Sequence, residues 1–136
     1  MTDCVFCRIV AGIEPVHLLY QDEGAWAFLD IDPVRTGHAL VVPVQHVPQV
    51  TVPGAAAAWA ATGQAVATVS RMLMDRLPAD GLSIFQSNGE SAGQTVDYLH
   101  LHLVPRIHGD RRLTNWTSDS EARTQVPAVH RRLTSQ

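Results

Sequence analysis

The chain has 136 residues, of which 46% are hydrophobic and 17% are charged, and its formal net charge is −3. This length suits one domain with a real core, so we expect a single domain over 1–136. A negative net charge excludes a general nucleic-acid binder, which needs many cations to neutralise phosphates. The opening residues lack the pattern of a signal peptide, and no stretch holds the roughly 18 apolar residues of a membrane span, so we expect a cytoplasmic protein that does not use a membrane.

The first half of the chain predicts short elements separated by turn residues. A helical turn is expected over 4–10, where the apolar residues fall on one side. The apolar runs 16–20 and 25–29 are joined by the polar segment 21–24, which predicts a β-hairpin. A β-branched run over 38–43 predicts a third strand.

The second half opens with the long helix that the sequence predicts over 55–77. Good helix formers fill this segment, Pro78 ends it, and Gly63 is its weak point. Its apolar stripe, which we expect to pack on the sheet, consists of Trp59, Val66, Val69, Leu73 and Leu77.

Two further strands, over 82–86 and 95–106, follow a turn and a polar loop. Residues 107–136 are polar and rich in arginine, with a short helix that Pro127 would disturb. The whole pattern predicts an α+β fold: an antiparallel sheet with one long helix and a short N-terminal helix.

The segment 97–106 carries the clearest candidate for chemistry. Strict alternation gives one apolar face and one face with two histidines, formed respectively by Leu99, Leu101 and Leu103 and by Tyr98, His100 and His102. Two side chains at this spacing on an exposed strand face lie about 7 Å apart. The histidines could be metal ligands, a nucleophile with a phosphate-binding partner, or plain solvent-facing residues.

The flanking residues favour the phosphate interpretation. Ser87-Asn88-Gly89 and Ala92-Gly93-Gln94-Thr95 supply amide, hydroxyl and backbone N–H donors beside the histidine face, and such donors suit phosphate oxygens.

This combination resembles the histidine triad (HIT) family, whose His-φ-His-φ-His-φ-φ motif follows Asn-Gly and Gly-Gln-Ser/Thr. Further matching motifs are Cys4-Val5-Phe6-Cys7-Arg8-Ile9, Phe28-Leu29-Asp30-Ile31-Asp32-Pro33, Gly37-His38 and Pro105-Arg106. The likeness covers about 3–116 and leaves 117–136 as a tail. It implies a HIT-like homodimer that binds purine nucleotides, with the long helix around Trp59 and the strand after it as the contact.

The resemblance also implies hydrolysis or transfer at the α-phosphate through a covalent nucleotidyl-histidine. The substrates would be nucleoside phosphoramidates or dinucleoside polyphosphates, and the product a nucleoside monophosphate. His100 takes the position of the nucleophile, His102 that of its partner at the phosphate or leaving group, and His38 that of a supporting histidine. The remaining implied contacts are Asn88, Gln94 and Thr95 for phosphate, Asp30 for ribose, and Val5, Phe6, Ile9 and Phe28 for the base.

Ordinary structural roles stay open for these residues. Asp30 could cap the end of a strand, His38 could be a buried histidine without a role, and the apolar residues could belong to the core. Arg106 is a further candidate for attracting phosphate, and Trp116 lies where some members place an aromatic side chain near the leaving group.

The chain departs from the pattern at Tyr98, where the family has the first triad histidine. A phenol can still form a hydrogen bond beside His100, so Tyr98 is expected to support the site. The departure leaves two alternatives to a hydrolase: a nucleotide-binding protein with little or no turnover, and a metalloprotein in which His100 and His102 ligate a catalytic metal.

The same departure bears on zinc. Zinc-bearing members use cysteines at the positions of Cys4 and Cys7, histidine at that of His46, and the first triad histidine, so three of four ligands remain here. Structural zinc is almost always four-coordinate, and His17 is a candidate for the missing donor. The alternative is two reduced thiols packed near the nucleotide, in a hydrolase that requires no cofactor.

Overall fold

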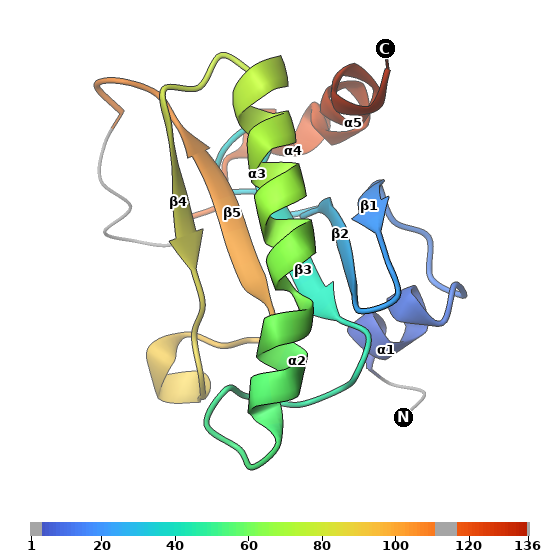
Figure 1. The fold of residues 1–136 in the computed structure, drawn as a ribbon. Coiled ribbons are helices and arrows are strands. Elements are labelled where there is room, and N and C mark those ends of the chain that lie inside the picture. Colours follow the sequence, from blue (N-terminus) through green and yellow to red (C-terminus); the bar gives the residue numbers. More distant parts are fainter. Residues whose placement is uncertain (1–3, 111–116, 136) are drawn as a thin grey trace.

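The protein is described here by a computed structural model that covers residues 4–110 and 117–135. Its elements in chain order are α1 (Val5–Val10), β1 (Leu18–Gln21), β2 (Ala25–Leu29), β3 (Ala39–Pro43), α2 (Ala55–Ala61), α3 (Gly63–Arg76), β4 (Gly81–Phe85), a 3-10 turn (Glu90–Ala92), β5 (Leu101–Arg106), α4 (Ser120–Thr124) and α5 (Val126–Thr134). The strands form one antiparallel sheet in the order β1-β2-β3-β5-β4 (Figure 1). The predicted α+β class and the predicted hairpin are confirmed. Trp116 lies outside the described residues.

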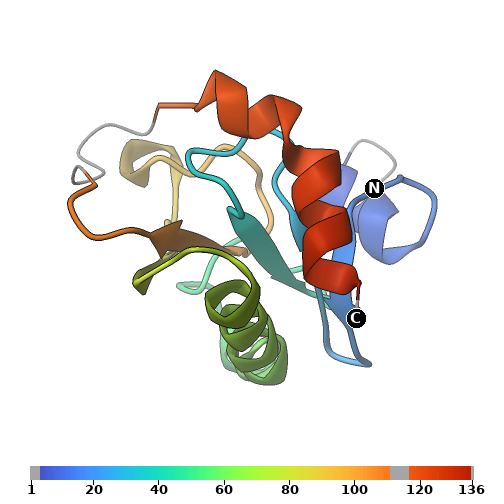
Figure 2. The ribbon, with the colours of Figure 1, turned by 90° about the horizontal axis from the view of Figure 1, so that it is seen from above.

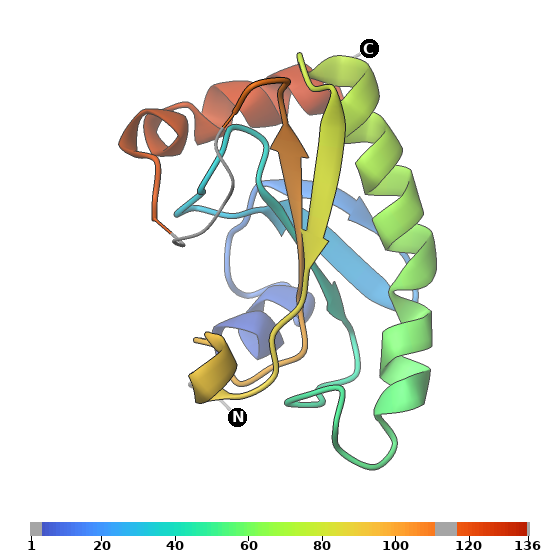
Figure 3. The ribbon, with the colours of Figure 1, turned by 90° about the vertical axis from the view of Figure 1, so that its left-hand side faces the viewer.

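Each face of the sheet has its own apolar cluster. Figure 3 shows α3 on one side of the sheet, and α1 together with the loop before β5 on the other. On the α3 side, Val41 and Leu103 of the sheet pack against Val69 and Leu73 of the helix, and all four are fully buried. Burial of each such side chain contributes about 1.5–3 kcal/mol, so this face supplies much of the stability.

The opposite face holds the aromatic cluster and the histidines. Its buried members are Phe6, Ile9, Phe28, Leu40, Val42 and Tyr98. Alternation along β3 explains the division, because Ala39 and Val41 face α3 whereas Leu40 and Val42 face α1. The residues that the resemblance singles out therefore lie on the face away from α3.

The long helix predicted over 55–77 is divided into α2 and α3. At the junction, both the backbone N–H and the hydroxyl of Thr62 donate to the carbonyl of Trp59, at 3.1 and 2.7 Å. This contact with the third residue back tightens the turn just before Gly63. The predicted stripe is confirmed at Val69, Leu73 and Leu77, which are buried, and at Val66, which packs against them. The burial predicted for Trp59 is wrong, because this residue is 40% exposed.

The C-terminal part is more ordered than the sequence indicated. Pro127 lies in the first turn of α5, where its missing N–H costs nothing, so it starts the helix that it was expected to disturb. Arg76 at the end of α3 donates to the carbonyls of Leu133 and Ser135, at 2.7 and 2.6 Å. These bonds fasten the end of α5 beside α3, as Figure 2 shows from above.

Gly37 permits the tight approach of the loop before β3 to the core. Its φ is +86°, and a Cβ there would lie 2.4 Å from a methyl carbon of Leu77. Only glycine fits such a position, and His38 follows it directly. No helix within 4–110 or 117–135 combines the length and hydropathy needed to span a membrane.

Candidate active site

Strand register brings the histidines together. Leu40 of β3 pairs with His102 of β5, and His38 lies two residues before Leu40, so both imidazoles occupy the same face. The ring centroids of His38 and His102 are 5.1 Å apart, and those of His100 and His102 are 4.9 Å apart.

The expected 7 Å spacing on an exposed face was wrong. The strand begins only at Leu101, because the N–H of Leu99 binds the carbonyl of Val47 and the N–H of Tyr98 binds that of Val96, at 2.7 and 2.8 Å. His100 therefore precedes the strand, and its ring packs edge-on against His102 with only 6% of the residue exposed.

The tautomer of His100 follows from one hydrogen bond. Its Nδ1 lies 2.6 Å from the backbone carbonyl oxygen of Tyr98. A carbonyl can only accept, so Nδ1 carries the proton and donates it. In the neutral ring, Nε2 then holds the lone pair, which is the arrangement that a nucleophilic imidazole requires.

A second chain of hydrogen bonds fixes the protons of His38 and His102. The backbone N–H of Val34 donates to Nδ1 of His38 at 3.1 Å, so the proton of His38 is on Nε2. That Nε2 lies 2.9 Å from Nδ1 of His102, which must accept. The proton of His102 is therefore on Nε2.

All three imidazoles are held neutral near pH 7. Burial lowers the pKa of His100, and the Tyr98 carbonyl opposes this only in part. Burial also lowers the pKa of His38 despite the nearby carboxylates of Asp30 and Asp32. Burial together with the two neighbouring histidines lowers the pKa of His102 to about 3. An uncharged cluster can bind a phosphate without a prior change of protonation.

The expectation that the phenol of Tyr98 would support His100 was wrong. The ring is fully buried, and its hydroxyl donates to the carbonyls of Pro43 and Val44, the latter at 3.1 Å. The ring stacks on His46, with centroids 4.4 Å apart and an interplanar angle of 13°. Tyr98 contributes to His100 through its backbone carbonyl alone.

The side chain of Gln94 holds the polar loop together. Its amide nitrogen donates to the carbonyls of Pro48 and Val96, at 2.8 and 2.9 Å, and its oxygen accepts from the N–H of Gly89 at 2.6 Å. Both amide hydrogens are used in this way. The direct phosphate contact expected of Gln94 is therefore not available in this conformation, and the side chain holds the loop in place instead.

Asn88 also fastens this loop, through a partner that the sequence did not indicate. Its oxygen accepts from the N–H of Val50 and from the amide of Gln86, at 2.7 and 2.9 Å, and its nitrogen donates to Gln86 at 2.7 Å. The only sign of the pairing with Gln86 in the sequence is that this second amide side chain lies two residues before Asn88. One amide hydrogen of Asn88 remains for a ligand, and the hydroxyl of the exposed Thr95 adds another donor.

Asp30 and the aromatic cluster lie next to the histidines. One carboxylate oxygen of Asp30 accepts from the N–H of Asp32 at 2.8 Å, and the other lies 3.5 Å from Nε2 of His38. Phe6 packs edge-on against His100, with centroids 5.2 Å apart. Phe6, Ile9 and Phe28 are at most 5% exposed and Val5 is half-buried, so these residues form a floor beside His100.

The guanidinium of Arg106, a candidate for attracting phosphate, is bound to an acidic side chain of its own chain. Its guanidinium binds the carboxylate of Asp110 through two nitrogens, at 2.9 and 2.6 Å, and a third nitrogen lies 3.3 Å from the hydroxyl of Ser83. This pairing holds the pKa of Asp110 at about 2. A cavity of about 610 Å³ lies nearby, between Arg35, Leu77 and α5, and no histidine is among the described residues that line it.

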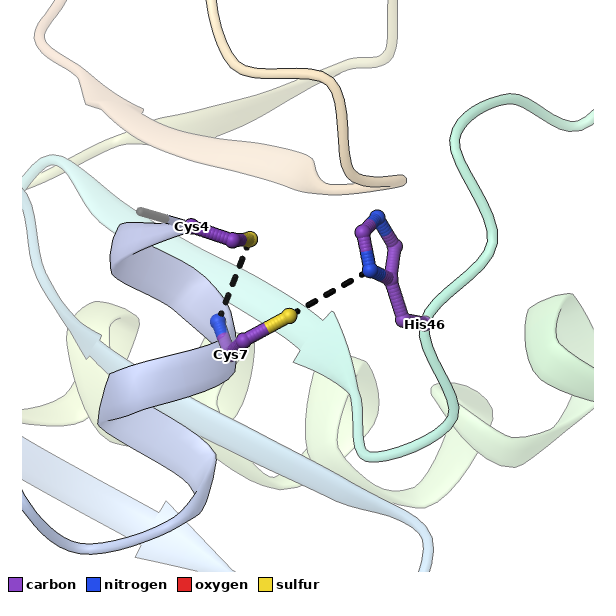
Figure 4. Close-up of side chains that lie close together, drawn as sticks. All are labelled: Cys4, Cys7 and His46. Atoms are coloured by element: carbon purple, nitrogen blue, oxygen red, sulfur yellow. Dashed lines mark hydrogen bonds between the residues drawn. The ribbon is translucent and has the colours of Figure 1, made fainter. Parts of the chain in front are cut away.

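Cys4, Cys7 and His46 form a second cluster (Figure 4). Their sulfur and Nδ1 atoms all lie within 4.8 Å of one another, and the Cys7 sulfur is 3.3 Å from Nδ1 of His46. Nε2 of His46 donates to the carbonyl of Asp97 at 2.9 Å, which leaves the Nδ1 lone pair facing the thiols. A carbonyl behind the imidazole is the usual support of a metal-bound histidine, so these residues fit zinc.

His17 does not belong to this cluster, which corrects the expectation that it supplies the missing donor. Its ring packs edge-on against His130 of α5, with centroids 5.4 Å apart. Asp30, His38 and His102 also lie within 4.8 Å of one another, but the direct 2.9 Å hydrogen bond between the two imidazoles already satisfies their facing nitrogens. His100 belongs to neither group, which weighs against the catalytic-metal alternative.

The fold and the site together define a class of protein in which three neutral histidines gather at the start of a strand of an antiparallel sheet. Among known proteins, adenylylsulfatase HINT3 of Arabidopsis thaliana is 32% identical over 142 residues, which cover 98% of this chain and 71% of that protein. Adenosine 5'-monophosphoramidase HNT1 of Saccharomyces cerevisiae is 27% identical over 137 residues, covering 96% and 80%. A zinc-bound histidine triad family protein from Mycobacterium smegmatis has a similar crystal structure, with a TM-score of 0.69, 38% identity, and coverage of 98% and 97%.

The family model described as the HIT domain matches residues 12–109. This chain therefore belongs to the HIT family.

Proposed function

We propose that this protein hydrolyses the α-phosphate linkage of nucleoside phosphoramidates or dinucleoside polyphosphates, with His100 as the nucleophile. The observation that carries the proposal is the hydrogen bond from Nδ1 of His100 to the Tyr98 carbonyl, because it places the lone pair on Nε2. Burial supports the proposal as well, since it lowers the pKa of His100 and keeps the ring unprotonated at neutral pH.

The reaction proceeds in two displacements. Nε2 of His100 bonds to the α-phosphorus, and the leaving group departs with its electron pair, as ammonia from an N-protonated phosphoramidate or as a nucleotide from a polyphosphate. The Tyr98 carbonyl stabilises the imidazolium of the intermediate by accepting from Nδ1. Water then attacks phosphorus, the P–Nε2 bond breaks, neutral His100 is restored, and a proton and the nucleoside monophosphate are released.

Neutral donors around the phosphate offset its developing charge. The Nε2–H of His102, the hydroxyl of Thr95 and the remaining amide hydrogen of Asn88 are assigned to phosphate oxygens. Gln94 holds the polar loop together, and its side-chain oxygen accepts from the N–H of Gly89. Asp30 is assigned to the ribose hydroxyls, and Val5, Phe6, Ile9 and Phe28 to the base as its apolar floor.

The alternative is a nucleotide-binding protein that Tyr98 has disabled. The geometry favours turnover, because His100 takes its orientation from the backbone of residue 98, and a histidine or a tyrosine there presents the same carbonyl. The names of the two relatives, an adenylylsulfatase and an adenosine monophosphoramidase, favour an adenylyl substrate with a small leaving group.

The test is AMP release from adenosine 5′-phosphoramidate and from diadenosine polyphosphates. We expect release by the native protein, a nucleotidyl adduct on His100 after a rapid alkaline quench, and no release by His100→Ala. If both proteins bind AMP and neither releases it from any of these substrates, the binding-protein alternative replaces this proposal.

A homodimer completes the proposal. β4 ends the sheet, and its Ile84 is 49% exposed, while Trp59 on α2 is 40% exposed. An edge strand with an exposed apolar residue favours pairing with a second copy. Light scattering at micromolar concentration tests this, and a monomeric mass would contradict it.

A further inference from the structure

The cavity of about 610 Å³ lies between the ends of α3 and β5, the loop before β3, and α5. Its volume falls within the roughly 300–1,000 Å³ of sites for small organic ligands. None of the described residues that line it is assigned to the nucleotide, so the cavity is separate from the proposed active site. Its apolar lining consists of Leu77, Pro78, Pro105, Ile107, Ala128 and Val129.

Hydrogen bonds between distant segments hold the walls of the cavity in place. Arg76 donates to the carbonyls of Leu133 and Ser135, at 2.7 and 2.6 Å, which fixes α5 beside the end of α3. The N–H of Asp119, the residue before α4, donates to the carbonyl of Pro33 at 2.9 Å, which fixes the start of α4 against the loop before β3. The cavity is therefore formed before a ligand arrives, and binding costs little ordering of the chain.

The charged side chains of the cavity leave one positive charge unpaired. Arg35 and Arg106 share the carboxylate of Asp110, at 3.6 and 2.6 Å. The carboxylate of Asp119 caps α4, 3.0 Å from a backbone nitrogen of that helix. Arg132 is exposed at the cavity, and within 4–110 and 117–135 its guanidinium forms neither a hydrogen bond nor an ion pair. The charges that line the cavity thus favour an anionic ligand.

We propose that this cavity binds a small organic carboxylate, whose apolar body lies against Leu77 and Val129 and whose charge pairs with Arg132. A guanidinium suits a carboxylate, because two parallel N–H groups donate to its two oxygens. The exposed Gln125 adds an amide donor at the rim. A single unpaired cation above an apolar wall selects a ligand that has one acidic group and an apolar body.

The cavity also touches the loop that carries a histidine of the proposed active site. Arg35 and Thr36 belong to the lining, and the carbonyl of Arg35 accepts from the N–H of His38 at 3.1 Å. His100 is not among the described residues of the lining. The carboxylate therefore contacts the loop before β3 without covering His100, and it binds at the same time as a nucleotide.

Fluorescence of anilinonaphthalenesulfonate, an apolar dye with one negative charge, tests this proposal in the native protein. We expect one dye per chain, displaced by octanoate and not by octanamide at the same concentration, because the amide lacks the charge. AMP should leave the dye bound, since the nucleotide occupies a different site. A native protein that does not bind the dye, equal displacement by octanoate and octanamide, or displacement by AMP would each overturn the proposal.

Matched variants place the dye in the cavity. Arg132→Gln should weaken binding of the dye and of octanoate about tenfold or more, because a charge-assisted hydrogen bond is lost. Arg131→Gln removes the same charge from the next residue of α5, outside the lining, and should bind within about twofold of the native protein. Ala128→Phe should abolish binding, because the ring fills the cavity.

The two glutamine variants decide the outcome even if Ala128→Phe fails to fold. Dye binding that is unchanged in Arg132→Gln, or equally weakened in both glutamine variants, would overturn the proposal. His100→Ala should bind the dye as the native protein does, so failure of the hydrolase proposal leaves this result unchanged.

Discussion

The buried histidine cluster makes the stability of this protein depend on pH, and replacement of His102 measures the effect. The pKa of His102 falls from 6.5 to about 3 on folding, so the unfolded chain binds a proton more readily than the folded one. The stabilisation from neutral His102 is therefore complete above pH 6.5 and is lost as the pH falls toward 3. At 1.36 kcal/mol per pKa unit, the loss between pH 7 and pH 5 is about 2 kcal/mol.

Urea unfolding at pH 7 and pH 5 tests this for the native protein, His102→Gln and the exposed control His108→Gln. Glutamine does not titrate but can still accept the hydrogen bond from His38, so His102→Gln should lose about 2 kcal/mol less between the two pH values. Carboxylates titrate alike in all three proteins and cancel in the comparison. An equal loss in His102→Gln and the native protein would refute the assignment of a strongly lowered pKa to His102.

Three further changes test separate parts of the structure. Tyr98→Phe should reduce the free energy of unfolding by about 1–3 kcal/mol, since two buried carbonyls lose a donor, yet leave kcat/KM within about twofold; a large loss of activity would mean that the hydroxyl takes part in the reaction. Gln94→Leu should raise KM about tenfold more than it lowers kcat, because its three bonds hold the polar loop; unchanged kinetics would contradict that role. The pH profile of kcat/KM should fall only below pH 6.5, as His100 becomes protonated beneath its ordinary pKa; a fall beginning above pH 7 would contradict its burial.

Local patterns in the sequence predicted the sheet well, because a half-buried strand imposes its alternation directly on the residues. The same alternation continued through Tyr98, Leu99 and His100, and there it predicted too long a strand. Hydrogen bonds to Val47 and Val96 bend the backbone at these positions, and Val47 is a contact of high sequence separation that a local pattern does not contain.

Side-chain partners of the candidate site show the same limit. Motif matching indicated which residues gather around His100, and the structure places His38, His102 and Asp30 there. Motif matching did not indicate that the side-chain amide of Gln94 would donate both of its hydrogens to backbone carbonyls. Pro127 is a different case, because proline in the first turn of a helix is a local signal that could have been used.

Residue 98 contacts two different parts of the structure, one through its backbone and one through its side chain. Its carbonyl faces His100 and fixes the proton there, whereas its side chain faces Pro43, Val44 and His46 on the other side. Every amino acid supplies the carbonyl, but only the side chain determines what packs against His46. A substitution at residue 98 therefore changes the contacts of His46 and leaves in place the carbonyl that orients the proposed nucleophile.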